Sequence, residues 1–474
     1  MAGREEKLAK NTIIYAIGSI GSKLVQIVLV PLYTRVMSSA EYGTVDILQA
    51  IVQLLVPIVV ISIFESVFRY AMEKEYDKIG VLSVGVFITL IGSAVMAILG
   101  IGASMFIDPV FVWLVVINTF LTALWTSLSQ YTRAIDRTVL FAVNNIFVTL
   151  LVLFFNVTFL VVLKWGITGY MLGYALANLF SCIFLMIFLK KDFKISFKNV
   201  DKALVKEMLG FSFPLMLNGI CWWLSSFTDR VMIVSFIGEA QNGIYSAASK
   251  VPHLLSVIVT IFYQAWQMTA NQEIKSDDTS AFYSKIYEQN SAFTFMLASA
   301  LILLSRPINA VFLGPEFSQA WFLMPALIIS TTFFSFGQFL IAIYSANKNT
   351  KNALITNMIC VGCNVVLNAV LIPIIGVLGA AIATALSYVI LWFIRIFDTG
   401  KIVKIQYNVR NIAISSAVIL LQSVLICLDK DVVITYGISA AGFLLLIVMY
   451  RKTVVALISF GMNMIKKLIV RKGD

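Results

Sequence analysis

Long apolar segments separated by short polar ones run along the whole chain. Fourteen of them are long enough to be transmembrane helices, because a hydrocarbon core of about 30 Å needs roughly 20 helical residues. The pattern therefore predicts an all-α polytopic membrane protein with about 14 transmembrane helices. The predicted spans are 11–35, 44–68, 79–102, 109–132, 139–163, 166–189, 208–237, 243–269, 282–306, 319–345, 352–373, 376–398, 408–428 and 431–451.

The composition agrees with this pattern. Hydrophobic residues make up 60% of the chain and charged residues 12%, whereas a soluble domain is about 45–50% apolar and about 25% charged. So little charge cannot cover the surface of a soluble protein of this size. The composition excludes a cytosolic enzyme, a nucleic-acid-binding domain and a disordered scaffold. The longest predicted cytoplasmic loop is only 190–207, so we expect the protein to act within the membrane.

Basic residues are concentrated on one side of the predicted membrane. The net charge is +11, and 28 of the 35 Lys and Arg residues lie in cytoplasmic segments or at the cytoplasmic ends of spans if the N-terminus is inside. Because basic residues accumulate in cytoplasmic loops, this bias predicts a multi-pass protein with both termini in the cytoplasm. The predicted outer loops hold only Arg35, Lys164, Arg306 and Lys430.

Three pairs of short motifs indicate an internal repeat that relates spans 1–6 to spans 7–12. Since six is an even number, the two halves enter the membrane in the same sense, as parallel repeats about an axis along the membrane normal. Such a duplication is typical of transporters. The paired motifs are GITG at 166–169 with GVLG at 376–379, Tyr131 and Asn144 with Tyr344 and Asn357, and AEYG at 40–43 with AQNG at 240–243.

The repeat predicts how the chain is divided. We expect an N-lobe at 1–200, a C-lobe at 201–407 and two extra helices at 408–452. The segment 453–474 is apolar with basic residues near its end. Such a segment is typical of an amphipathic helix in the interface, which we expect on the cytoplasmic side.

Polar residues recur at helical spacing on spans 1, 2, 7 and 8, so that each of these spans has a polar face. Charges within spans are costly and should face the bundle interior or water. We therefore predict a hydrated cleft lined by these four helices. The polar faces include Lys23, Asp46, Gln49, Gln53, Asn218, Trp222, Ser225, Asp229, Tyr245, Ser249 and Tyr263.

The predicted cleft contains fixed cations and aromatic side chains. Arg and Lys bind phosphate groups, and aromatic faces can stack on sugar rings. These residue types favour an anionic, sugar-bearing substrate. The candidate substrate-binding residues are Lys23, Arg35, Arg69, Trp222, Arg230, Tyr245, Lys250, His253 and Tyr263, and the candidates for ion coupling are Asp46, Glu65 and Asp229.

Several of these residues also have a structural interpretation. Arg230 can pair with Asp229 or with a neighbouring helix, and Lys250 can extend outward to the interface. Arg69 can be a topology charge near the cytoplasmic edge. His253 can be a hydrogen-bonded packing residue or can titrate near neutral pH.

Motifs for nucleotide or metal chemistry are absent from the sequence. Gly400-Lys401 lacks the glycine spacing and the following Ser or Thr of a P-loop, and the chain has one histidine. The Cys360–Cys363 pair has no second pair nearby, which argues against a zinc site. We expect no cofactor, no metal and no catalytic residue. Uphill transport would then use an ion gradient or substrate turnover elsewhere.

Several ordered motifs resemble a known family. They are PLYTRVMSSAEYG at 31–43, QYTRA at 130–134, FSFP at 211–214, TDR at 228–230 and GIYS at 243–246. Together they resemble the polysaccharide transporter family. Its members are lipid-linked oligosaccharide or O-antigen-type flippases of the multidrug/oligosaccharidyl-lipid/polysaccharide exporter superfamily.

The resemblance implies two six-helix lobes, with spans 13 and 14 beside them, that work by alternating access. It implies that an undecaprenyl-diphosphate-linked oligosaccharide moves from the inner to the outer leaflet of a bacterial cytoplasmic membrane, driven by an ion gradient as in an antiporter. The implied partners are this anionic lipid, membrane lipids and the polymerase and glycosyltransferases of a cell-surface polysaccharide. No enzymatic activity and no nucleic acid are implied.

Two other functions stay open. A cation-coupled multidrug exporter of the same superfamily would need a cleft dominated by carboxylates. A membrane-embedded glycan polymerase or ligase would typically carry catalytic residues on a large outer loop. The sequence does not distinguish an O-antigen, a capsule, a teichoic acid or an exopolysaccharide as the glycan.

Overall fold

The protein is described by a computed structural model, which places residues 29–189, 195, 201–274, 278–347, 350–428 and 432–455. Helices dominate these ranges, and no strand occurs in them, so the all-α prediction is confirmed. By its internal contacts the chain divides into unit 1, Met1–Val231, and unit 2, Met232–Asp474. The division falls within a helix rather than in a loop.

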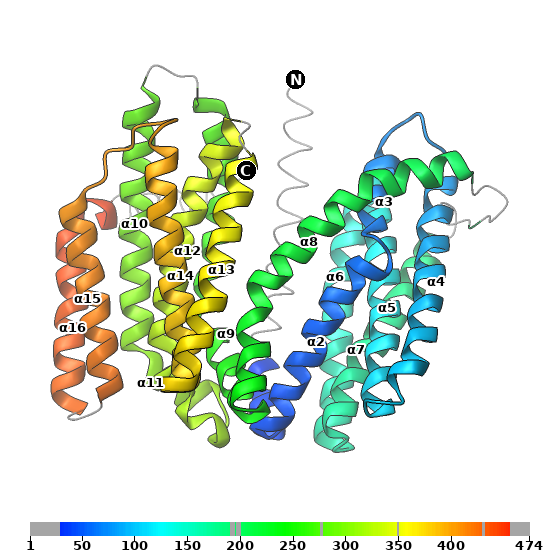
Figure 1. The fold of residues 1–474 in the computed structure, drawn as a ribbon, viewed down its shortest axis with the longest axis horizontal. Coiled ribbons are helices and arrows are strands. Elements are labelled where there is room, and N and C mark those ends of the chain that lie inside the picture. The colour runs from blue at the N-terminus through cyan, green and yellow to red at the C-terminus, as the bar shows by residue number, and fades with distance from the viewer. Residues whose placement is uncertain are drawn as a thin grey trace, which may run out of the picture. The chain divides into compact units, whose positions relative to one another are not determined.

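The described part of unit 1 begins with a helical stretch at 29–36, and seven further α-helices start within that part. One of them continues into a π-helical turn, η1. The elements are α2 (Ser39–Val59), α3 (Ile63–Met72), α4 (Lys78–Ala103), α5 (Pro109–Ala134), α6 (Thr138–Asn156), η1 (Val157–Val162), α7 (Gly166–Phe188) and α8 (Lys202–Phe236), the last of which crosses the division (Figure 1).

Unit 2 is also helical in its described part. Its elements are α9 (Glu239–Glu273), α10 (Thr279–Leu303), α11 (Ser305–Phe312), the 3₁₀-helix η3 (Pro315–Phe322), α12 (Met324–Ala346), α13 (Thr350–Ile375), α14 (Val377–Thr399), α15 (Val409–Leu428) and α16 (Val432–Met449).

Nine of the described helices are long and apolar enough to cross a membrane. There are ten if α10 and α11, which are bent by 60° at their junction, form one span. The chain is therefore a multi-pass membrane protein. Predicted spans 3–6 and 10–13 match single helices or helix pairs to within a few residues. The total of fourteen stays a prediction, since most of span 1 lies outside the described residues, α8 and α9 are more polar, and α16 is short.

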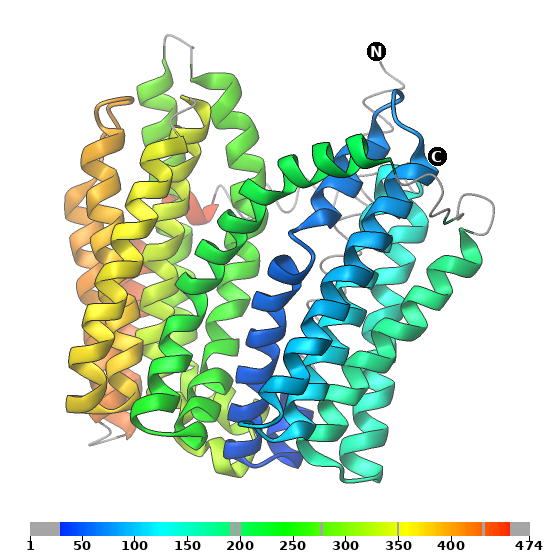
Figure 2. The same ribbon diagram turned by 45° about the vertical axis from the view of Figure 1, so that its right-hand side comes forward.

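The predicted span 44–68 is not one continuous helix. It is interrupted at residues 60–62 between α2 and α3, where Ile61 and Ser62 have φ angles of 50° and 49°. Pro57 has no N–H and disfavours a regular helix around it, and its carbonyl accepts a hydrogen bond from Ser62 N at 2.8 Å. Both views of the fold show this interruption as a bend in the blue part of the ribbon (Figures 1 and 2).

Glycine allows α4 to approach this bend closely. A Cβ atom at Gly92 would collide with the carbonyl oxygen of Val59, the last residue of α2. Glycine at position 92 therefore has a packing reason, because a side chain at this position would push the two helices apart.

The starts of α7 and α14 each have a glycine with a positive φ angle. Gly166 and Gly376 have φ angles of 53° and 66°, a region that glycine adopts without steric cost. Three residues later, Gly169 and Gly379 lie against the carbonyl oxygens of Phe159 and Leu371, so neither has room for a side chain. These turns are one of the pairs of motifs from which the repeat was predicted.

Aromatic side chains form much of the core of unit 2. The indole of Trp266 stacks on Phe339 with ring centroids 4.3 Å apart and donates a hydrogen bond to the carbonyl of Phe339 at 3.0 Å. Trp392 donates to the hydroxyl of Tyr287 at 2.9 Å. The first pair joins α9 to α12, and the second joins α14 to α10. Both hydrogen bonds satisfy an indole N–H group, which needs a partner when it is buried.

Candidate functional site

A membrane-embedded ion pair joins α2 to α8 inside unit 1. Nε of Arg230 lies 2.8 Å from Oδ2 of Asp46, and their side chains are only 20% and 12% exposed. Neither atom has a partner with hydrogen-bond geometry, so the contact is one of charge rather than a directed hydrogen bond. Each group neutralises a charge that would be costly to bury alone.

Three hydrogen bonds link α8 to α2, to α3 and to the residues just after α3. Tyr76 donates to Glu207 at 2.7 Å, Ser66 donates to the carbonyl of Met208 at 2.6 Å, and Trp223 donates to the carbonyl of Ala50 at 2.7 Å. Residue numbers rise along α8 as they fall along α3 and α2, so α8 runs antiparallel to both. The Asp46–Arg230 pair is the contact of this series nearest the start of α2.

Arg69 does not lie in a buried site. Its guanidinium is 60% exposed and pairs with Glu73 at 2.9 Å on the same helical face, an arrangement that contributes little energy in solvent. Glu65 is partly buried within electrostatic reach of Arg133, whose guanidinium lies 4.5 Å from the ring centroid of Phe68. The basic and acidic candidates of α3 therefore have partners of their own.

The other candidates of unit 1 occupy different environments. Asp229 is 8% exposed and has an interaction partner. Arg35 is exposed on the helical stretch at 29–36 and also has an interaction partner. Lys23 lies outside the described residues, and of Trp222 only the backbone is described. The structure thus brings together one predicted substrate-binding residue, Arg230, and one predicted ion-coupling residue, Asp46.

Four predicted residues lie on α9 in unit 2. Tyr245 is buried, Lys250 is partly buried and His253 is exposed, and all three have interaction partners. Tyr263 is partly buried and lies within electrostatic reach of Arg395. The described contacts do not gather these four residues into one site.

Sequence reasoning missed the most deeply buried cation of the described chain. Arg395 of α14 is 1% exposed. It donates from Nη1 to the carbonyl of Gly337 at 2.8 Å, from Nη2 to Asn357 at 2.8 Å and from Nε to Thr356 at 3.2 Å. These bonds join α12, α13 and α14 around one guanidinium.

A second polar contact lies one turn further along α14. Asp398 accepts hydrogen bonds from Tyr344 and Asn352, both at 2.8 Å. The signal was present in the sequence, since an arginine within an apolar span is costly and needs partners. Tyr344 and Asn357 were recognised only as markers of the repeat, although each contacts one of these two charged residues.

The chain was compared with known proteins. The polysaccharide biosynthesis protein family matches residues 8–267, more than half of the 474 residues. An archaeal relative from Haloferax volcanii, named "Probable low-salt glycan biosynthesis flippase Agl15", is 23% identical over 228 residues, which are 46% of each chain. The uncharacterized membrane protein MJ1375 of Methanocaldococcus jannaschii is 22% identical over 45% of this chain and 50% of its own. The match thus spans about half the length of these curated relatives.

Solved structures share the fold over a longer range. A structure titled "Lipid II flippase MurJ, inward closed conformation" has a TM-score of 0.69 at 16% identity, covering 93% of this chain and 100% of its own. An inward-facing multidrug resistance MATE family transporter of the MOP superfamily has a TM-score of 0.62 at 11% identity, covering 80% and 95%. At these identities the likeness shows the fold. With the family match, it follows that this chain belongs to the polysaccharide biosynthesis protein family and has the fold of the multidrug/oligosaccharidyl-lipid/polysaccharide exporter superfamily.

Proposed function

We propose that the protein is a flippase that moves an undecaprenyl-diphosphate-linked oligosaccharide from the inner to the outer leaflet of a bacterial cytoplasmic membrane, with both chain termini in the cytoplasm. The family match and the printed names of two similar proteins, a glycan biosynthesis flippase and a lipid II flippase, support this class of substrate. The oligosaccharide would be a precursor of a cell-surface polysaccharide, supplied by glycosyltransferases and used by a polymerase.

The Asp46–Arg230 ion pair is the observation that supports the mechanism. A guanidinium binds phosphate oxygens well, because its N–H groups match their geometry. Asp46 neutralises Arg230 at 2.8 Å. We propose that the diphosphate of the substrate replaces Asp46 as the partner of Arg230, so that a cation stays available without being left unpaired in the membrane.

Asp46 is also a candidate for ion coupling. An inward ion gradient can drive outward transport of the headgroup only if ion and substrate cross in opposite directions. We therefore propose that Asp46 takes up a proton or a sodium ion after the substrate has left Arg230 and releases it on the inside. Alternating access would carry the lipid headgroup across while its tail stays in the bilayer.

The test is reconstitution in liposomes with a fluorescent lipid-linked oligosaccharide and an enzyme that cleaves the glycan only on the accessible leaflet. We expect transfer by the wild type and a loss of about ten-fold or more in rate for Arg230→Gln, since a charge-assisted hydrogen bond contributes about 1.5–3 kcal/mol. Arg410→Gln, at an exposed arginine of unit 2, is the matched control and should keep the wild-type rate. Equal rates for wild type and Arg230→Gln would contradict the role of this residue.

A multidrug exporter is the second candidate, because the MATE transporters share the fold and Asp46 is a partly buried carboxylate that can bind a cation. It predicts efflux of cationic dyes from vesicles that needs Asp46 and not Arg230. Dye efflux together with absence of glycan transfer would favour this function over the proposed one.

A further inference from the structure

The end of unit 2 at which α9 and α14 begin contains a small pocket of about 280 Å³. Its walls come from the first two turns of α9, from η3 and the residue after it, and from the first residue of α14. The volume is close to the lower end of small-molecule sites, which start at about 300 Å³. Of the residues that line it, Gln241, Gln319 and Trp321 carry polar side-chain atoms, and Ile244, Phe322, Leu323 and Val377 are apolar.

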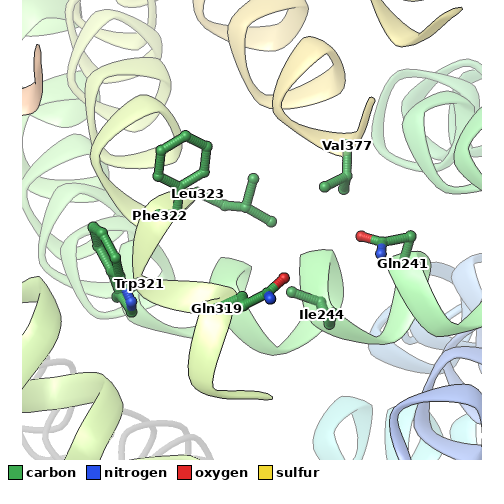
Figure 3. Close-up of a pocket in the computed structure, with 7 residues that line it drawn as sticks. All are labelled: Gln241, Ile244, Gln319, Trp321, Phe322, Leu323 and Val377. Atoms are coloured by element: carbon green, nitrogen blue, oxygen red, sulfur yellow. The ribbon is translucent and has the colours of Figure 1, made fainter. Parts of the chain in front are cut away.

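The two glutamines face each other across this pocket. Figure 3 shows the carboxamide of Gln241 directed inward from α9 and that of Gln319 directed toward it from η3. Each carboxamide offers two N–H donors and one carbonyl acceptor, and the side chains lining the pocket carry no charge. Such a pair suits a ligand with several hydroxyl groups, which donate and accept in turn.

The indole of Trp321 completes one side of the pocket. The guanidinium of Arg306 lies 4.0 Å from its ring centroid and also donates to the carbonyl of Ile426 at 3.4 Å. The guanidinium thus packs on the indole and is itself held by the end of α15. A rigid aromatic side chain beside amide groups provides apolar contact for the C–H face of a sugar ring and hydrogen bonds for its hydroxyls.

The corresponding corner of unit 1 is closed. There, Glu41 accepts hydrogen bonds from the backbone N–H of Ser38 at 2.9 Å and from its hydroxyl at 3.1 Å, in a capping box at the start of α2. The same carboxylate fills the space over Gly166, where a Cβ atom would lie 2.8 Å from Oε1. The acidic side chain is therefore fully used within the fold.

In unit 2 the equivalent positions have different residues. Gly238 is the N-cap of α9 and has no side chain to hold Gln241, and a Cβ atom at Gly376 would meet nothing within 4 Å. The motif AQNG at 240–243 thus repeats AEYG at 40–43 without its cap. The second copy of the corner is open, and its amide is directed into the pocket.

We propose that this pocket binds a neutral sugar residue of the transported glycan. The inference rests on the proposed function, and in the proposed orientation this end of unit 2 faces the outside of the cell. The pocket would hold the leading sugar once the headgroup has crossed. Its neutral lining predicts a preference for uncharged hexoses over uronic acids, because an unpaired carboxylate is costly to desolvate.

Saturation-transfer NMR on the purified full-length protein tests the proposal, with methyl glucoside, methyl galactoside, N-acetylglucosamine and glucuronic acid as probes. We expect transfer to at least one neutral sugar, weakened by roughly three- to ten-fold in Gln241→Leu and in Gln319→Leu, since a hydrogen bond contributes about 0.5–1.5 kcal/mol. Gln406→Leu, at an exposed glutamine between α14 and α15, is the matched control and should bind as the wild type does.

A further variant distinguishes loss of sugar binding from loss of folding. Val377→Phe keeps the pocket apolar but fills it, and its melting temperature reports whether the fold is kept. Absence of transfer to every neutral sugar in the wild type, or equal transfer in both glutamine variants and Val377→Phe, would overturn the proposal. Failure of the proposed function looks different, because the wild type would then bind free sugar but move no lipid-linked glycan.

Discussion

Arg230 of α8 and Asp46 of α2 approach to 2.8 Å within unit 1, and both side chains are largely shielded from solvent. Breaking a fully buried ion pair by removing one partner costs about 3–5 kcal/mol, because a charge remains without compensation. Partial exposure reduces this cost. We expect Asp46→Asn and Arg230→Gln each to lower the free energy of unfolding by about 1–3 kcal/mol, and the double variant to be more stable than either single one. Thermal unfolding in detergent checks this, and additive losses would contradict it.

Exchange of the two charges separates stability from transport. In Asp46→Arg/Arg230→Asp the ion pair is kept but the cation moves from α8 to α2. We expect most of the thermal stability of the wild type and a rate of glycan transfer at least about ten-fold lower, since the diphosphate would meet a carboxylate on α8. The liposome assay measures the rate. Full transfer by the exchanged pair would mean that only the pairing matters.

Arg395 should be important for the stability of unit 2. Replacement by Met removes the donors of three hydrogen bonds and leaves acceptors on α12 and α13 unsatisfied. Each unsatisfied buried group costs about 1–3 kcal/mol, so we expect a loss of roughly 2–5 kcal/mol. Arg395→Lys should recover only part of it, because an ammonium lacks the planar arrangement of donors. Calorimetry in detergent is the measurement, with Arg410→Met at the exposed arginine as control.

The two glycine turns predict unequal effects of the same substitution. Alanine at Gly166 or Gly376 must adopt a positive φ, a strained conformation that costs about 1–3 kcal/mol. At Gly166 the new Cβ also meets the carboxylate of Glu41 and disturbs the capping box, whereas at Gly376 it meets nothing within 4 Å. We expect Gly166→Ala to be the more destabilising by about 1 kcal/mol. Equal melting temperatures of the two variants would argue against the difference between the corners.

The Tyr76–Glu207 contact predicts a pH effect at the α3 end of unit 1. The hydrogen bond to Glu207 raises the pKa of Tyr76 from 10.0 to about 12. A raised pKa in the folded state means that the contact stabilises the fold below pH 10 and that this contribution is lost as the pH rises toward 12. The absorbance titration of wild type minus Tyr76→Phe should show this late ionisation. Glu207→Gln should move it back toward pH 10, and an unchanged titration would refute the assignment.

Much of the fold could be predicted from hydrophobic periodicity. The spans that became α4, α5 and α7 were placed to within a few residues, because in a membrane every backbone polar group must be paired within a helix. The interruption after α2 was not predicted. The bend lies where Gly92 of α4 approaches the carbonyl of Val59, a tertiary contact that periodicity does not reveal.

The candidate site was predicted less completely. The cost of charge in a membrane correctly selected Asp46 and Arg230 as unusual, but their pairing depends on how α8 packs along α2 and α3. Arg395 escaped notice because basic residues near a predicted cytoplasmic edge are common, and only its burial distinguishes it. The pocket of unit 2 could not be found from sequence, since its opening depends on a missing cap at Gly238.

The paired corners at Glu41 and Gln241 also have a practical consequence. One molecule carries a capped and an uncapped version of the same turn. The signal of a spectroscopic label at one site can therefore be compared with that of a label at the other site in the same sample. Differences in detergent, lipid, temperature or preparation cancel in such a comparison, and a signal confined to the uncapped corner reports on events there alone.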